Sequence, residues 1–379
     1  MRATIAVLPG DGIGPEVTAQ AVAALRAVAA RFGHELTLIE RVVGQQAILD
    51  EGTALSDETF DVCARSDAIL FGAIGSLPAR FARAGGARPE DALYRLRRGF
   101  DLFANIRPVL PLPELAAASP LKADIVAGTD LVFVREMSAG LYYGFSEDTA
   151  LKPSRITGTG AETVAVDTLR YTRTEIERAL RVAFELAARR RGHLTSVDKA
   201  NVLSSSVLWR RCVEAIAPEY PMVTVEHLLV DACAMKLVQD PSAFDVVVTE
   251  NLFGDILTDE ASVITGSIGM LPSASLGPTR PGSAARSALY EPIHGSAPTI
   301  AGQDRANPLG AILSAAMLLR LSLQLPEEAS AVEEAVAAVI RSGFRTEDIA
   351  EPATTVVGTT EMGELVAAHL TAPAGANLA

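Results

Sequence analysis

The stretch Asn251-Leu-Phe-Gly-Asp255-Ile-Leu-Thr-Asp259 directly follows a β-rich run at residues 244–249. We expect Gly254 to mark the break and a helix to continue from Asp255. On that helix Asp255 and Asp259 are four residues apart, so both carboxylates lie on one face, about a turn apart. Like charges at this spacing repel each other unless a cation lies between them. The pair is therefore a candidate site for a hard divalent ion such as Mg²⁺ or Mn²⁺, and the alternative is a solvated acidic helix face.

Length and composition restrict the class of protein. The chain has 379 residues, enough for two domains, and its 49% hydrophobic and 21% charged residues are typical of a folded globular protein. A net charge of −13 argues against nucleic acid or an anionic membrane as the main partner. The three cysteines are too widely spaced for a disulfide framework or a zinc motif. With no signal peptide and no membrane-spanning stretch in the sequence, we expect a cytoplasmic protein.

Strand and helix patterns alternate along the chain. Short apolar runs at 4–8, 68–71 and 193–198 alternate with helical patterns at 15–30, 175–190 and 308–323, which predicts an α/β fold. Thr172 and Glu175 have the spacing of a capping box. The glycines at 10, 12 and 14 are spaced G-x-G-x-G, and no acidic residue after a second strand completes a dinucleotide fingerprint. We interpret this segment as a tight strand-to-helix turn that a ligand could approach.

Several charged or polar side chains fall at predicted strand ends or turns. Three arginines suit a dicarboxylate, because guanidinium binds carboxylate bidentately, and three aspartates suit one divalent ion. One lysine and one tyrosine can act as general base and general acid. Each also has a structural alternative: Arg97 as a helix C-terminal charge, Tyr142 as a surface aromatic, and Lys199 as a salt-bridge partner of Asp198. The candidates are Arg97, Arg107, Arg135, Tyr142, Lys199, Asp231, Asp255 and Asp259.

Several long motifs follow one another along the chain. They are Gly10-Asp-Gly-Ile-Gly-Pro-Glu16, Asp101-Leu-Phe-Ala-Asn-Ile-Arg-Pro108, Asp198-Lys-Ala-Asn-Val-Leu203, the 251–259 stretch, Gly266-Ser-Ile-Gly-Met-Leu-Pro-Ser-Ala-Ser-Leu276 and Glu291-Pro-Ile-His-Gly-Ser-Ala-Pro298. In this order they resemble the motifs of the isocitrate/isopropylmalate dehydrogenase family, and most closely its isopropylmalate branch. The resemblance covers nearly the whole chain and implies two α/β domains around a central mixed sheet, with a non-Rossmann cofactor site. A cofactor-binding domain would comprise residues 1–102 and 266–379, and a substrate, metal and dimerisation domain residues 103–265.

The resemblance implies a metal-dependent oxidative decarboxylation by NAD. The expected reaction converts (2R,3S)-3-isopropylmalate to 4-methyl-2-oxopentanoate in leucine biosynthesis. Lys199 would take the hydroxyl proton and Tyr142 would protonate the enol carbon. In the family, Lys199 and Asp231 reach the site from the partner subunit, which implies a homodimer with shared sites. Arg97, Arg107 and Arg135 would hold the substrate carboxylates, and Asp231, which also contacts substrate, would bind Mg²⁺ or Mn²⁺ with Asp255 and Asp259.

The resemblance also assigns the cofactor site and the side-chain pocket. Thr299 stands where NAD-using members carry Asp, yet the Lys-Tyr pair of NADP users is also missing, so NAD is the expected cofactor. Tyr94 replaces a usual Leu in the pocket for the 3-substituent, and Met137-Ser-Ala-Gly140 replaces a usual Thr-Gly-Gly. The expected cofactor residues are Ile13, Glu291, His294, Gly295, Ser296, Ala297, Thr299 and Asn307, and the expected pocket residues are Glu90, Leu93, Tyr94 and Val202.

Two other functions remain open at this point. One is a dehydrogenase for isocitrate, homoisocitrate or another 3-substituted malate, although Glu90 and Leu93 suit a γ-carboxylate poorly. The other is a non-catalytic regulatory subunit on the same fold. Such subunits lose metal or acid–base residues, whereas this chain keeps Lys199, Tyr142 and all three aspartates.

Overall fold

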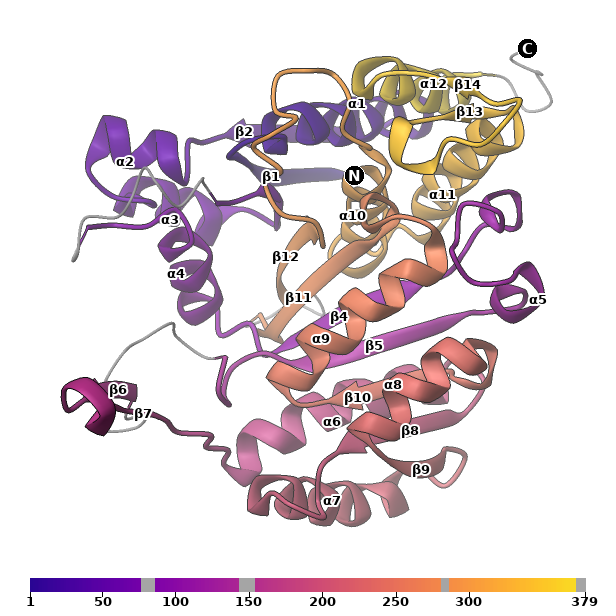
Figure 1. Ribbon diagram of the computed structural model, residues 1–379. Helices are drawn as coiled ribbons and strands as arrows, with labels where there is room; N and C mark the ends of the chain where they lie inside the picture. Colours follow the sequence, from indigo (N-terminus) through magenta and orange to yellow (C-terminus); the bar gives the residue numbers. More distant parts are fainter. Residues whose placement is uncertain (76–85, 143–153, 281–285, 373–379) are drawn as a thin grey trace. The chain divides into compact units, whose positions relative to one another are not determined.

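The computed structural model describes residues 1–75, 86–142, 154–280 and 286–372 (Figure 1). Contacts between residues divide the chain into two compact units. The first unit comprises Met1–Leu102, Leu110–Ala127 and Ser262–Ala379, and the second comprises Phe103–Val109 and Gly128–Ala261. The assignment of cofactor and substrate roles to two domains, with cuts at 102 and 265, stays a prediction.

The first unit contains five strands in the order β2-β1-β3-β12-β11. β1 runs parallel to β2 and β3, and β3 runs parallel to β12, whereas β11 and β12 are antiparallel. A short parallel pair, β13 with β14, lies apart from them. The strands are β1 (Arg2–Gly10), β2 (Glu35–Glu40), β3 (Ala68–Ala73), β11 (Pro272–Thr279), β12 (Arg286–Pro292), β13 (Phe344–Arg345) and β14 (Thr355–Val356).

Helices cover these strands with their apolar faces. α1 buries Val17, Ala21, Leu25 and Val28, a stripe of one residue per turn that packs toward β1, β3 and α10. α10 is buried on nearly every side, as its largely apolar sequence requires. The helices are α1 (Gly14–Phe32), α2 (Gln45–Glu51), α3 (Asp57–Arg65), α4 (Asp91–Gly99), α5 (Ala123–Val126), α10 (Leu309–Leu321), α11 (Pro326–Arg341) and α12 (Thr359–Thr371).

The second unit contains five strands in the order β4-β5-β10-β8-β9. β4 is antiparallel to β5, and the other three pairings are parallel. Parallel strands end at one edge, so the residues that follow β5, β10, β8 and β9 gather there. The strands are β4 (Ala104–Val109), β5 (Leu131–Glu136), β8 (His193–Asp198), β9 (Thr224–Leu229), β10 (Val246–Thr249) and a separate antiparallel pair, β6 (Ser154–Thr157) with β7 (Val164–Asp167).

The helices of the second unit confirm one local prediction and correct another. Thr172 and Glu175 form the expected capping box at the start of α6. The helix of the opening stretch, however, begins at Asn251 rather than Asp255, so the prediction that Gly254 marks the break is wrong. The Glu250 carboxylate accepts hydrogen bonds from the backbone N–H groups of Leu252 and Phe253, which secures the earlier start. The helices are α6 (Arg173–Ala188), α7 (Ser204–Ile216), α8 (Val230–Gln239) and α9 (Asn251–Ser262).

Both units therefore combine helices with strands of mixed direction, and the predicted α/β class is confirmed. β3 is buried along its whole length and apolar on both faces, as a parallel strand covered by helices must be. In the part of the chain that the structure describes, no helix is long and apolar enough to cross a membrane.

Candidate active site

Most of the candidate residues of the second unit lie where its parallel strands end. Arg135 is near the end of β5, Asn251 follows β10, Lys199 follows β8 and Asp231 follows β9. The register places Thr249 of β10 beside Arg135 on one neighbouring strand and Val197 on the other. The sheet order thus brings together residues that are far apart in the sequence.

Arg135 is fixed before any ligand binds. It is only 1% exposed, and its stem lies against Gly254 of α9. Its Nε and Nη2 groups donate to Asn251 Oδ1 at 3.0 and 2.8 Å, and its Nη1 group donates to Asp255. A buried arginine held by an amide and a carboxylate has little rotational freedom left to lose when it binds an anion.

Asp255 and Asp259 both face guanidinium groups from neighbouring strands. Asp259 lies 3.7 Å from Arg107 of β4, and Arg107 also donates to Thr258 Oγ1 at 2.6 Å. Partial burial raises the pKa of Asp259, and the charge of Asp255 raises it further against the opposing effect of Arg107 and Arg135. The two carboxylates therefore repel each other, while each lies near an arginine. The assignment of the pair to a divalent ion stays a prediction.

Lys199 forms an ion pair with Asp231 at 2.5 Å, while Asp198 pairs with Arg210 at 2.6 Å. The predicted alternative, in which Lys199 serves as the partner of Asp198, is therefore wrong. The Lys199 hydrogen bond lowers the pKa of Asp231, so that carboxylate stays ionised. The backbone N–H of Lys199 donates to Ser206 Oγ at 3.0 Å, which holds the turn that carries the lysine.

Tyr142 and Val202 lie at the surface of the second unit. The Tyr142 ring is 40% exposed, and the Arg135 guanidinium carbon lies 4.9 Å from its centroid. This cation–π contact places the phenol beside the arginine that is expected to bind substrate. Val202 is 70% exposed on the Lys199 turn, available to a ligand at that edge.

The glycine turn of the first unit connects three loops. The backbone N–H of Ile13 donates to the Ser296 carbonyl at 2.8 Å, and a side chain at Gly12 would collide with that same carbonyl. Asp11 accepts from the N–H groups of Gln45 and Gly75, at 2.8 and 3.2 Å. The glycines therefore permit close contact between loops, which agrees with a tight turn and not with a Rossmann fingerprint.

The other expected cofactor residues of the first unit form the loop after β12 and its support. Among the described residues, the Nε2 atom of His294 is buried without a hydrogen-bond partner, and burial lowers the pKa of this imidazole. A side chain at Gly295 would meet nothing within 4 Å, and Ala297 has a positive φ of 36°. Asn307 donates to Asp348 at 3.1 Å. Thr299 is exposed, and its carbonyl accepts a hydrogen bond from Gln303.

Arg97 lies near the C-terminus of α4 and pairs with Glu291 of β12 at 3.3 Å. The pair links an expected substrate residue to an expected cofactor residue. The Arg97 Nε atom is buried and has no partner within the described chain, so it can still donate to a ligand. The pocket candidates lie before Arg97 in the chain: Glu90 is the N-cap of α4, and Leu93 and Tyr94 lie in the first half of that helix.

The residues that hold this site are not among those predicted from the sequence. Asn251 lies in the 251–259 stretch without a predicted function, and Glu136 and Tyr171 have no predicted function either. The sequence did contain a signal for Glu136, because an acidic residue in an apolar strand is rarely buried unless it has a polar partner. No local signal identified Tyr171. The structure brings together Arg107, Arg135, Tyr142, Asp255 and Asp259 in one cluster and Lys199 with Asp231 in another, both in the second unit.

Comparisons with known proteins find relatives that match this chain over nearly its whole length. The profile of the isocitrate/isopropylmalate dehydrogenase family matches residues 4–366. The 3-isopropylmalate dehydrogenase of Moorella thermoacetica is 54% identical over 97% of this chain and 98% of its own length. That of Geobacillus kaustophilus is 53% identical over 95% of this chain and 93% of its own length. The crystal structure of isocitrate dehydrogenase from Methylococcus capsulatus matches with a TM-score of 0.83 at 32% identity, covering 98% of this chain and all of that one.

Proposed function

The chain belongs to the isocitrate/isopropylmalate dehydrogenase family, and from this premise we propose that it oxidatively decarboxylates 3-isopropylmalate with NAD. The observation that carries the proposal is the cluster of Arg135, Arg107, Asp255 and Asp259. It offers cations for a dicarboxylate beside carboxylates for a divalent ion, which is the combination that a 2-hydroxy diacid needs. The relatives are named 3-isopropylmalate dehydrogenase, and the same activity in this chain would serve leucine biosynthesis.

Each protein side chain has a defined task in this reaction. The bonds from Arg135 to Asn251 and Asp255 use three of the five donors of a guanidinium, counted over the described residues, which leaves two for a substrate carboxylate. Lys199, in its neutral amine form, would accept the hydroxyl proton, and Asp231 holds the lysine side chain in place. Tyr142, held against Arg135, would deliver a proton to the carbon that loses CO₂.

The acidic residues fit a divalent ion. Among the described residues, no group of three or more His, Cys, Asp or Glu side chains could hold a metal, so one chain supplies only Asp255 and Asp259. A third carboxylate, Asp231, would come from a second copy. A bound Mg²⁺ or Mn²⁺ would polarise the oxygen atoms of the substrate, and NAD would accept the hydride.

The loop after β12 fits a nucleotide. His294 Nε2 is buried and without a hydrogen-bond partner in the described chain, and the open space at Gly295 allows a phosphate to approach the backbone. Burial that lowers the His294 pKa keeps the ring neutral, able to share a hydrogen bond with a base or ribose. Thr299 would offer the ribose only one hydroxyl group, so it does not by itself select NAD. We propose NAD because the sequence of this loop contains no lysine, which NADP-using members carry in a Lys-Tyr pair.

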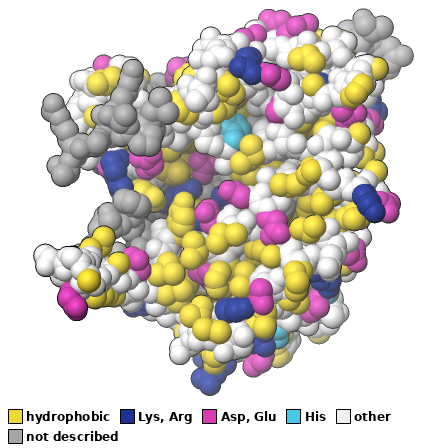
Figure 2. Space-filling model, viewed as in Figure 1, with side chains coloured by type: hydrophobic (Ala, Val, Ile, Leu, Met, Phe, Trp, Pro, Cys, Tyr) yellow, Lys and Arg dark blue, Asp and Glu magenta, His cyan; other side chains and the backbone are white. Residues whose placement is uncertain are grey.

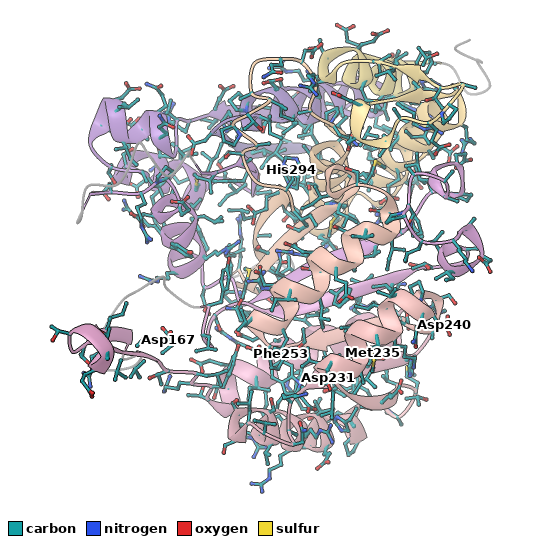
Figure 3. All side chains as sticks on the ribbon, in the orientation of Figure 1. Asp167, Asp231, Met235, Asp240, Phe253 and His294 are labelled. Carbon is teal, nitrogen blue, oxygen red and sulfur yellow. The ribbon has the colours of Figure 1, made fainter. Side chains whose placement is uncertain are left out.

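A homodimer would complete each site. Helices α8 and α9 expose apolar side chains, among them Met235 (59%) and Ile256 (59%). Figure 2 shows hydrophobic side chains over this part of the second unit, and in Figure 3 Met235 and Phe253 project from the two helices, with Asp231 on the same helix as Met235. Exposed apolar surface of this kind marks an interaction site. We assign it to a second copy of the chain, whose Lys199 and Asp231 would join the Asp255–Asp259 pair of the first.

A substrate panel tests the proposal. We expect the purified enzyme with Mn²⁺ and NAD to oxidise 3-isopropylmalate with a higher kcat/KM than isocitrate, homoisocitrate, 3-methylmalate or 3-ethylmalate, and to prefer NAD over NADP. Tyr94, in place of a leucine, gives a specific reason to test the smaller malates, because the larger ring would narrow the pocket. A preference for one of them would replace 3-isopropylmalate as the substrate, and no turnover of any would reject the dehydrogenase.

A further inference from the structure

A buried polar cluster lies next to the proposed substrate site of the second unit and has no assigned role. It comprises Glu136 at the end of β5, Tyr171 just before α6, and Glu250 and Asn251 at the start of α9. Glu136, Glu250 and Asn251 are buried. Buried polar groups that are hydrogen-bonded to one another fix a structure far more tightly than apolar contacts do, so this cluster calls for an explanation.

The Tyr171 hydroxyl is the centre of the cluster. It accepts the backbone N–H of Asn251 at 3.0 Å and donates to Glu250 Oε2 at 3.2 Å. Glu136 acts on the same hydroxyl: after burial, its negative charge is the largest cause of the raised Tyr171 pKa. The edge of the Tyr171 ring meets Trp209, with ring centroids 6.4 Å apart at 76°, which stops the ring from turning.

From this hydroxyl, one branch leads to Arg135. Asn251 receives its backbone bond from Tyr171, and its side-chain oxygen accepts two N–H donors of Arg135. Its side-chain nitrogen donates to the Ala139 carbonyl at 2.9 Å. Both the oxygen and the nitrogen of the Asn251 side chain are therefore hydrogen-bonded, which fixes the orientation of the amide group. The fixed amide in turn orients the Arg135 guanidinium.

A second branch leads to Tyr142. The Glu136 carboxylate accepts from the backbone N–H groups of Ser138 and Ala139, at 2.7 and 3.2 Å, and from the Ser138 hydroxyl. Gly140 follows with φ +82°, and a Cβ there would lie 2.5 Å from the Tyr171 hydroxyl. Only glycine therefore lets this turn pass beneath Tyr171 and deliver Tyr142 to the Arg135 guanidinium.

We propose that Tyr171 is a positioning residue that sets Arg135 and Tyr142 through Asn251 and Glu136. The inference rests on the proposed function, because it concerns the same substrate site. Tyr171 touches neither substrate nor cofactor in this assignment. Its hydroxyl fixes the first helical turn of α9 relative to the turn after β5. The Arg135 guanidinium and the Tyr142 phenol then face the same substrate.

The electrostatics of the cluster agree with this role. Burial raises the pKa of Glu136 to about 7 and also raises the pKa of Glu250. Two buried carboxylates around one hydroxyl would repel each other without a proton donor between them. The Tyr171 hydroxyl donates its single proton to Glu250, and burial raises the Tyr171 pKa well above its usual value, so the hydroxyl keeps that proton.

Tyr171→Phe removes the hydroxyl and keeps the ring. With 3-isopropylmalate, Mn²⁺ and NAD, we expect the KM for 3-isopropylmalate to rise about 10-fold and kcat to fall several-fold, while the KM for NAD stays within about twofold. The matched control is Tyr290→Phe, which also removes a buried hydroxyl, bonded to Ser322 at 2.7 Å in the first unit. The control should leave the KM for 3-isopropylmalate unchanged.

A double-mutant cycle locates the effect. Asn251→Ser alone should raise the KM for 3-isopropylmalate more than Tyr171→Phe does. The double variant should have the KM of Asn251→Ser, since the branch from Tyr171 to Arg135 runs through Asn251. Multiplying effects, or a Tyr171→Phe variant that loses only thermal stability, would overturn the proposal.

Crystal structures of wild type and Tyr171→Phe separate this inference from the proposed function. The contact between Arg135 Nε and Asn251 Oδ1, 3.0 Å in the wild type, should lengthen or break in the variant. An unchanged Arg135 would overturn the positioning role whatever the substrate. A wild type that does not oxidise 3-isopropylmalate would reject the proposed function instead, and the geometry of Arg135 would still decide this inference.

Discussion

Gly254 lies inside α9, where glycine normally destabilises a helix, and we expect Gly254→Ala to impair substrate binding. A Cβ at this position would lie 2.7 Å from Arg135 Cγ and 2.9 Å from Arg135 Cβ. Cβ and Cγ are the first side-chain atoms of Arg135, and the residue is buried, so rotation of the outer side-chain bonds cannot relieve the clash. The guanidinium must move with its stem, away from Asn251 and Asp255.

The size of the effect follows from this contact. Two carbon atoms in ordinary contact are about 3.5 Å apart, so Arg135 Cγ must retreat by about 0.8 Å from its 2.7 Å position. Alanine favours the helix by about 1 kcal/mol over glycine, whereas overpacking costs about 1–3 kcal/mol. We therefore expect about 1 kcal/mol less unfolding free energy. A misplacement of about 1 Å lowers rates about 100-fold, so kcat/KM for 3-isopropylmalate should fall about 10- to 100-fold.

Steady-state kinetics and urea unfolding would be measured on the same preparations. The control is Gly363→Ala in α12, another helical glycine whose added Cβ would collide with the side chain of Gln20 in the first unit. The control should lose stability without changing the KM for 3-isopropylmalate. A stable Gly254→Ala enzyme with wild-type kcat/KM would refute the argument that Arg135 needs this space.

The other predictions concern the metal, the base, the dimer and one buried acid. EDTA should abolish activity and Mn²⁺ restore it; activity that survives chelation would reject the metal site. Lys199→Met should lower kcat by about 10²- to 10⁴-fold with an unchanged unfolding midpoint, and near-normal turnover would reject its role as base. Mixing inactive Lys199→Met and Asp255→Asn subunits should restore activity, because a heterodimer has one intact site; no recovery would argue against shared sites. Glu136 has a pKa of about 7 when folded and 4.5 as a free side chain, so the native state holds its proton longer, and stability should fall as pH rises between these values. Relative to Glu136→Gln, the wild type should lose about 3 kcal/mol over that range in urea unfolding, and parallel pH profiles would contradict this.

Local features of the fold followed from the sequence because their causes are local. The capping box of Thr172 and Glu175 depends on residues three apart, and it forms as predicted. The G-x-G-x-G turn was correctly interpreted as a tight connection and not as a Rossmann fingerprint. The α/β class was confirmed because alternating strand and helix patterns can be recognised in the sequence alone. The family resemblance was confirmed because its long motifs are also properties of the sequence and do not depend on packing.

The start of α9 was mispredicted because its cause is not local. Gly254 signals a helix break by propensity alone, but Glu250 caps the helix earlier and the stem of Arg135 occupies the space that a side chain at 254 would need. Arg135 comes from a strand that is distant in the sequence. No rule based on neighbouring residues could have found this contact.

The sequence by itself determined the chemical inventory: the arginines, the aspartates, Lys199 and Tyr142, on strand ends of an α/β protein. Only the tertiary structure decided the pairing, with Asp255 beside Arg135, Asp259 beside Arg107, and Lys199 on Asp231 instead of the adjacent Asp198. The physical reason is that charge pairing depends on distance in space, which the strand order β4-β5-β10-β8-β9 sets by joining segments that the chain keeps far apart.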